Sequence, residues 1–170
     1  MTPSEVRAGI AAFGAHYSYD TAYLQALYDA APGAHTAFSA AMPLSRHREA
    51  LPRDAHFIAR VAAMHTDDCG ACTQLNLRMA VEAGVDRTLL RTLLEAPEHL
   101  PADLALVRAH AIQVVSGENA DPERLARLTE RYGAHGVAEL ATAIAGGRLF
   151  PTLKRALGLE SACALPHLDF

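Results

Sequence analysis

Apolar residues recur at spacings of three and four through almost the whole chain, which is the period of one helix face. The clearest stretch follows Pro52, where Phe57, Ile58, Val61 and Met64 fall on one stripe. No segment shows the alternating apolar and polar pattern of a half-buried strand. Alanine and leucine, both good helix formers, dominate the composition. The pattern therefore predicts an all-α fold.

Capping signals and breakers predict where the helices begin and end. The first four residues after Met1, Thr2-Pro3-Ser4-Glu5, have the form of a capping box with proline in the first turn, and this helix should reach about His16. Later helices are expected from Asp20 or Thr21 to Pro32-Gly33, over 34–48 with a break at Pro43, from Pro52, and from the cysteine pair to Gly84. The remaining ones should run from Asp86 to Pro97, over 101–116, from Asp121 to about Gly133, and over 136–157 with weak points at Gly146-Gly147 and Pro151.

Length and charge limit the class of protein. The 170 residues favour a single domain over 1–170, and with half of them hydrophobic the composition is globular. The net charge is -4, no Lys/Arg cluster indicates nucleic-acid binding, and Lys154 is the only lysine. No apolar run reaches about 18 residues, and the first residues do not resemble a signal peptide. We expect a cytoplasmic protein with neither nucleic acid nor membrane as partner.

Two cysteines three residues apart, Cys69 and Cys72, stand in the segment HTDDCGACTQLN at 65–76. A structural zinc site needs four ligands, usually in two close pairs, and the chain has one such pair. His65 and Asp68 are too close in sequence to complete the site without strain. We therefore expect no metal, and no glycine-rich phosphate loop indicates a nucleotide cofactor.

Two other interpretations of the pair stay open. Free cysteine is among the most buried residue types, so both thiols could be packed core residues. If Asp67 or Asp68 caps the next helix, however, the cysteines lie in its first turn, where the helix dipole favours a thiolate. Positions three apart share a face, which suits a short, reversible disulfide. The two aspartates act in the opposite direction, because nearby negative charge raises a thiol pKa.

The order of these segments resembles the AhpD-like alkylhydroperoxidase and carboxymuconolactone decarboxylase family over roughly residues 34–157. The helix RDAHFIARVAAMHT leads into CGAC at the start of the helix QLNLRMAVEAG, and DRTLLRTLL follows. The later segment YGAHGVAELATAIAGGRLFPTLKRALG is similar to the closing helix of the family.

The resemblance implies a peroxiredoxin-type oxidoreductase with a redox-active disulfide and no cofactor or metal. Cys72 would attack a hydroperoxide, Cys69 would be the resolving thiol, and an external dithiol would reduce the disulfide. The family also implies a homo-oligomer, a trimer or a hexamer. A thiol–disulfide oxidoreductase or redox sensor without peroxidase activity is an alternative, and a non-catalytic helical oligomer is another.

The proton relay departs from the family pattern of a glutamate about a dozen residues before the first cysteine and a histidine four after the second. Here His56 stands near the place of the acid, and Asn76 occupies that of the histidine. Asparagine cannot act as a general base, so the resemblance implies an atypical relay. His65, four residues before Cys69, is another candidate base, unless it is a core residue on the apolar stripe. For His56 the alternative is a solvated surface histidine.

Several further features allow a structural and a functional interpretation. Four tyrosines near the N-terminus suit packing or a subunit surface, or the rim of a substrate pocket: Tyr17, Tyr19, Tyr23 and Tyr28. Cys163 is expected to be an inert thiol. The other histidines show no metal-ligand spacing and are expected on the surface: His16, His35, His47, His99, His110, His135 and His167.

Overall fold

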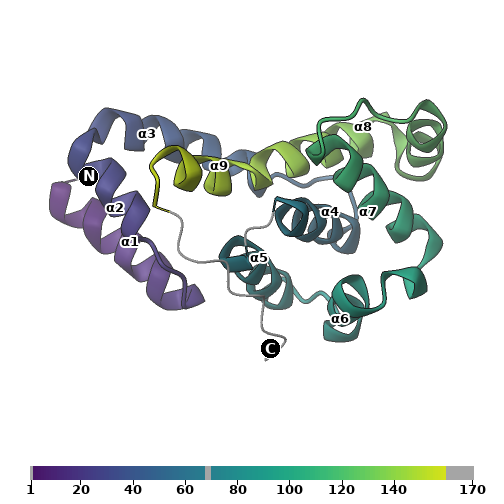
Figure 1. The fold of residues 1–170 in the computed structure, drawn as a ribbon, viewed down its shortest axis with the longest axis horizontal. Coiled ribbons are helices and arrows are strands. Elements are labelled where there is room, and N and C mark those ends of the chain that lie inside the picture. The colour runs from purple at the N-terminus through teal and green to yellow at the C-terminus, as the bar shows by residue number, and fades with distance from the viewer. Residues whose placement is uncertain (1, 68–69, 160–170) are drawn as a thin grey trace.

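The computed structural model describes residues 2–67 and 70–159, and these form an all-α fold (Figure 1). The predicted fold class is confirmed, and the described ranges contain no strand. None of the helices there combines the length and the apolar character that a membrane span requires. The elements are α1 (Pro3–Tyr17), α2 (Ala22–Ala30), α3 (Pro32–Ala41), η1 (Met42–Ser45), α4 (Arg53–Thr66), α5 (Gly70–Glu82), α6 (Arg87–Glu95), η2 (Pro97–His99), α7 (Ala102–Val115), α8 (Pro122–Gly147) and α9 (Leu149–Ala156).

Helix α4 lies at the centre of the fold. It packs against α5, α7 and α8, while α1, α2 and α3 lie at one end of the molecule (Figure 1). Every residue from Ala55 to Met64 is buried, so this helix has no solvent face over almost three turns. Alanines make up much of that run, and small side chains let neighbouring helices approach closely. The buried apolar residues form one core cluster that extends from Ile10 to Phe150.

The predicted helix starts are confirmed where a side chain caps the backbone. Thr2 and Glu5 form the capping box of α1, with Glu5 N–H donating to Thr2 Oγ1 at 3.3 Å. Asp86 accepts from the N–H groups of Thr88 and Leu89 at the start of α6. Asp121 accepts in the same way at the start of α8. Such caps satisfy donors that have no partner within the helix, and they act locally.

Three boundaries differ from the prediction. The third helix begins at Pro32 rather than at residue 34, and it changes to the 3-10 turn η1 at Met42. The break at Gly133 is present as a residue with φ of 70° inside α8, as expected. The helix predicted over 136–157 is divided at its expected weak point Gly146-Gly147, because α8 ends at Gly147 and a separate helix α9 begins at Leu149. Pro151 falls in the first turn of α9, where the missing N–H is tolerated.

Gly146 lets α8 pack directly on the backbone of η1. A Cβ atom at this position would lie 2.5 Å from the backbone N of Ser45 and 2.8 Å from the carbonyl carbon of Leu44. We expect Gly146→Ala to lower the free energy of unfolding by about 1–3 kcal/mol, measured by urea denaturation. The matched control is Gly9→Ala in α1, where the added Cβ meets nothing within 4 Å and the helix should gain about 0.5–1 kcal/mol. Equal stability of Gly146→Ala and the native chain would contradict this packing.

Candidate functional site

Cys72 is the third residue of α5 and lies in the core, with 1% of its surface exposed. Its position in the first turn agrees with the sequence prediction for the second cysteine. The Tyr19 hydroxyl lies 3.6 Å from the Cys72 sulfur, within hydrogen-bond distance for a thiol. Cys69 and Asp68 lie outside the described residues, as does Cys163. Among the three cysteines, Cys72 is thus the one whose surroundings the structure describes.

Tyr19 reaches this position from the turn that follows α1. Its backbone N–H donates to the Gly14 carbonyl at 2.8 Å, and this bond directs the chain back toward α5. Tyr19 and Tyr23 are both buried, and their hydroxyl oxygens lie 3.3 Å apart. Burial, with the neighbouring Tyr23 and Cys72, raises the pKa of Tyr19. The phenol therefore keeps its proton at neutral pH and can donate it.

Lys154 adds a positive charge to this cluster from α9. Its ammonium nitrogen lies 4.5 Å from the centroid of the Tyr19 ring and 4.9 Å from that of Tyr23. The residue is 3% exposed, and Nζ has no hydrogen-bond partner among the described residues. Cation–π contact with two ring faces accounts for its burial. The only lysine of the chain thus lies against the tyrosine whose hydroxyl contacts Cys72.

Asn76 is buried on the next turn of α5. Its Nδ2 donates to the backbone carbonyl of Cys72 at 2.8 Å, while Oδ1 has no hydrogen-bond partner among the residues that the structure describes. The amide is therefore oriented by its own helix. In this arrangement Asn76 can position the cysteine turn, but it has no basic atom that would accept a proton.

For the two candidate histidines on α4, the structure contradicts the non-functional interpretation that the sequence allowed for each. His65 is exposed, so the alternative of a buried core residue is wrong. His56 is 2% exposed, so the alternative of a solvated surface histidine is wrong. Burial, together with the positive charges of Arg60 and Arg48, lowers the pKa of His56 to about 4. His56 is therefore neutral at pH 7 and acts only as a hydrogen-bonding group.

Asp67 is the C-cap residue of α4. The predicted N-cap of the next helix, Asp67 or Asp68, stays a prediction, because residues 68–69 lie outside the described ones. The Asp67 carboxylate is largely buried and accepts two bonds from the Arg148 guanidinium, at 3.0 and 3.2 Å. Arg155 lies 3.6 Å from the same carboxylate and also donates to the Asp67 carbonyl. These contacts tie the end of α4 to α8 and α9. They also offset the negative charge that the sequence places before the cysteines.

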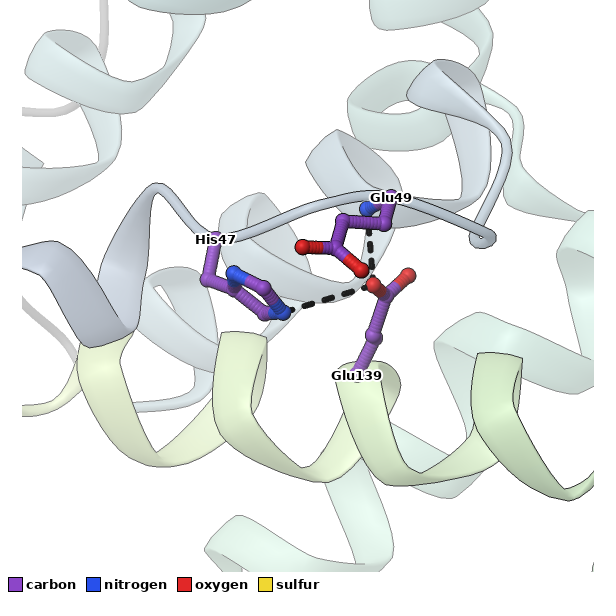
Figure 2. Close-up of side chains that lie close together, drawn as sticks. All are labelled: His47, Glu49 and Glu139. Atoms are coloured by element: carbon purple, nitrogen blue, oxygen red, sulfur yellow. Dashed lines mark hydrogen bonds and ion pairs between the residues drawn. The ribbon is translucent and has the colours of Figure 1, made fainter.

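A buried carboxylate on α8 holds the loop that precedes α4. Glu139 accepts from the backbone N–H groups of Glu49, Ala50 and Leu51 at 2.7, 2.9 and 2.6 Å. Figure 2 shows His47 and Glu49 above Glu139, with the His47 ring directed at its carboxylate at 3.5 Å. Within the described ranges, these three side chains form the group whose ligand atoms lie close enough for a cation, within 4.8 Å of one another. The three backbone donors show that Glu139 primarily anchors the loop.

Tyr19 and Lys154 are the site residues that the sequence did not single out. The tyrosine cluster was identified, but nothing in the spacing places Tyr19, rather than its neighbours, beside Cys72. The available signal for Lys154 was its uniqueness in the chain. The expected surface position also fails for one histidine, because His110 is buried in α7.

Comparison with known proteins found no match among family models, curated proteins or solved structures. The resemblance to AhpD-like proteins, with the activity and the oligomer that it implies, therefore stays a prediction.

Proposed function

We propose that this chain is a thiol-dependent peroxidase of the AhpD-like kind, in which Cys72 attacks a hydroperoxide and Cys69 resolves the product. The observation that carries the proposal is the position of the Cys72 sulfur in the first turn of α5, 3.6 Å from a protonated phenol. A thiol in a helix N-terminal turn is favoured as thiolate by the helix dipole. A neighbouring O–H donor is what the leaving oxygen of a peroxide requires.

The charges around the site support a thiolate. Lys154 brings its ammonium against the ring of Tyr19, whose hydroxyl lies 3.6 Å from the Cys72 sulfur. The opposing charge of Asp67 is engaged by Arg148 and Arg155. The contacts of Asp67 with two arginines therefore weaken one of the negative charges that the sequence places before Cys72.

The reaction proceeds in three balanced steps. The Cys72 thiolate attacks one peroxide oxygen, the O–O bond breaks, and the leaving alkoxide takes a proton from the Tyr19 hydroxyl to depart as an alcohol. A proton from solvent, equal to the one that Cys72 released on ionising, then restores the Tyr19 phenol. Cys72 is now a sulfenic acid. The Cys69 thiol condenses with it, forming the S–S bond and releasing water. An external dithiol then reduces the disulfide by two exchange steps and becomes a disulfide itself.

In this proposal Tyr19 donates the proton in place of the glutamate and histidine of the family relay. Asn76 orients the Cys72 turn through the backbone carbonyl, and the exposed His65 and the neutral His56 have no assigned chemical step. A homo-oligomer and a cytoplasmic dithiol reductant are part of the proposal through the family resemblance.

Mass spectrometry of the reduced protein after one equivalent of hydroperoxide tests this function. We expect a Cys69–Cys72 disulfide in the native chain. In Cys69→Ser the product should stop at a sulfenic acid on Cys72, which a dimedone adduct would identify. The variant Cys163→Ser serves as the control for the third thiol and should behave like the native chain.

The alternatives predict different results in the same experiment. A disulfide that forms with small oxidised dithiols but not with hydroperoxide would favour a thiol–disulfide oxidoreductase or sensor. Thiols that react no faster than an ordinary cysteine with either reagent would make the pair structural and the helical oligomer non-catalytic.

A further inference from the structure

Three arginines surround a pocket of about 410 Å³ that is separate from the contacts of Cys72 with Tyr19. Arg60 comes from α4, and Arg46 and Arg48 come from the loop after η1. In residues 2–67 and 70–159, no carboxylate lies within ion-pair distance of any of these guanidinium groups. The one acid on the pocket wall, Glu82, is held by His16 at 3.0 Å and by the Tyr17 hydroxyl. The pocket is therefore electropositive.

Arg60 is the unusual member, because it is 3% exposed and has no counter-charge among the described residues. Its Nη2 lies 3.8 Å from the Met79 sulfur and its guanidinium carbon lies 5.5 Å from the Phe57 ring centroid. Its Nε has no hydrogen-bond partner in the part of the chain that the structure describes. Burial and the nearby Arg46 lower the pKa of Arg60 to about 10, which still leaves it charged at neutral pH. A buried charge with such weak partners is costly, and an anion entering the pocket would remove that cost.

His56 presents a second unsatisfied group to the same pocket. The residue is only 2% exposed, and its buried Nδ1 has no hydrogen-bond partner within 2–67 and 70–159. The ring is neutral at pH 7, so it can contribute one directed hydrogen bond while the arginines supply the charge. Because a backbone hydrogen bond to Ser45 engages the one ring N–H, the remaining nitrogen is an acceptor. An anion with a protonated oxygen for this nitrogen and a charged oxygen for the arginines would satisfy both groups.

The loop that carries Arg46 and Arg48 is held before any ligand arrives. Glu139 binds the backbone of residues 49–51, and Figure 2 shows this loop lying over α8. Arg48 also donates to the Leu51 carbonyl at 3.4 Å. Preorganised donors lower the entropic cost of binding.

We propose that this pocket binds a small organic anion through its carboxylate or phosphate group. The guanidinium groups of Arg46, Arg48 and Arg60 take the charged oxygens, and Arg60 makes the buried contact. Phe57 and Met79 supply an apolar wall for the remainder of the ligand. The inference does not depend on the redox function of the cysteines.

Thermal unfolding and isothermal titration calorimetry with two probes, inorganic phosphate and benzoate, test the proposal. Ionic strength is held constant with chloride, so that general screening is the same in all samples. The native chain should bind at least one of the two probes and rise in Tm with its concentration, because a ligand that binds only the folded state stabilises it. Phosphate and benzoate distinguish a bare oxyanion site from one that also needs an apolar body.

Arg60→Met removes the buried charge at similar volume, and we expect it to fold and to lose probe binding. Arg46→Gln changes an exposed side chain and should weaken binding about tenfold. The matched control Arg87→Gln replaces an exposed arginine on α6, outside the pocket, and should bind like the native chain. Absence of binding to the native chain, or equal binding by Arg46→Gln and Arg87→Gln, would overturn the proposal even if Arg60→Met failed to fold.

Discussion

Tyr19→Phe is expected to slow the reaction of the reduced protein with hydroperoxide by about a hundredfold, the lower end of what positioned proton transfer contributes. The substitution removes the hydroxyl that lies 3.6 Å from the Cys72 sulfur. It keeps the ring over which Lys154 lies, so the packing and the positive charge stay in place. Stopped-flow measurement of thiol loss under single-turnover conditions gives the rate.

Two control variants are measured beside Tyr19→Phe. Cys72→Ser sets the background rate, since it removes the attacking sulfur altogether. Tyr28→Phe deletes the hydroxyl of a buried tyrosine whose described ring contacts are with Arg7 and His35, and it should react at the native rate. If Tyr19→Phe also reacts at the native rate, the phenol is not the proton donor, and the proposed relay is wrong while the redox pair can still stand.

Glu139→Gln should lower the free energy of unfolding at pH 7 by about 3 kcal/mol, a value expected when a buried group loses charge-assisted hydrogen bonds. Three backbone N–H groups converge on the carboxylate, at 2.6 to 2.9 Å. A glutamine turns one of those acceptors into an NH₂ group that faces another donor. Urea denaturation measures the loss. Glu49→Gln is the control, because that side chain is 68% exposed and pairs only loosely with His135 at 3.9 Å.

The pH dependence of the free energy of unfolding should differ between the native chain and Glu139→Gln. Burial alone would raise the pKa of Glu139, but the backbone donors of Leu51, Glu49 and Ala50, with the charge of His135, hold it below its ordinary value of 4.5. A carboxyl with a lowered folded-state pKa contributes stability that is complete above its unfolded pKa and is lost as pH falls through the folded one. The native chain should therefore lose stability on acidification below about pH 4.5, and Glu139→Gln should lose less. Parallel curves for the two chains would contradict the anchoring role.

Local signals in the sequence were sufficient for the helix class and for most helix starts. Thr2, Asp86 and Asp121 cap the helices that they were expected to cap, because a cap involves a side chain and a backbone N–H two or three residues away. The end of α8 falls at the weak point expected at Gly146-Gly147, but the sequence does not predict that Gly146 packs on the backbone of η1, which comes from another part of the chain.

The two histidines of α4 show why a periodic pattern has limits. The stripe of apolar residues distinguishes a buried face from an exposed one only when the helix has both. Because α5, α7 and α8 surround α4, His56 and Arg60 are buried although they lie off the stripe. His65, near the helix end, is exposed although its spacing puts it on the stripe.

The sequence by itself determined the all-α class, the caps, and the place of Cys72 in the first turn of a helix, because each depends on residues within a turn or two of one another. Only the tertiary structure decided what surrounds that cysteine. Tyr19 and Lys154 come from the two ends of the described chain, and long-range packing of α1, α5 and α9 brings them together. The same holds for the three arginines around His56, whose meeting depends on a loop that Glu139 holds from a helix some ninety residues away.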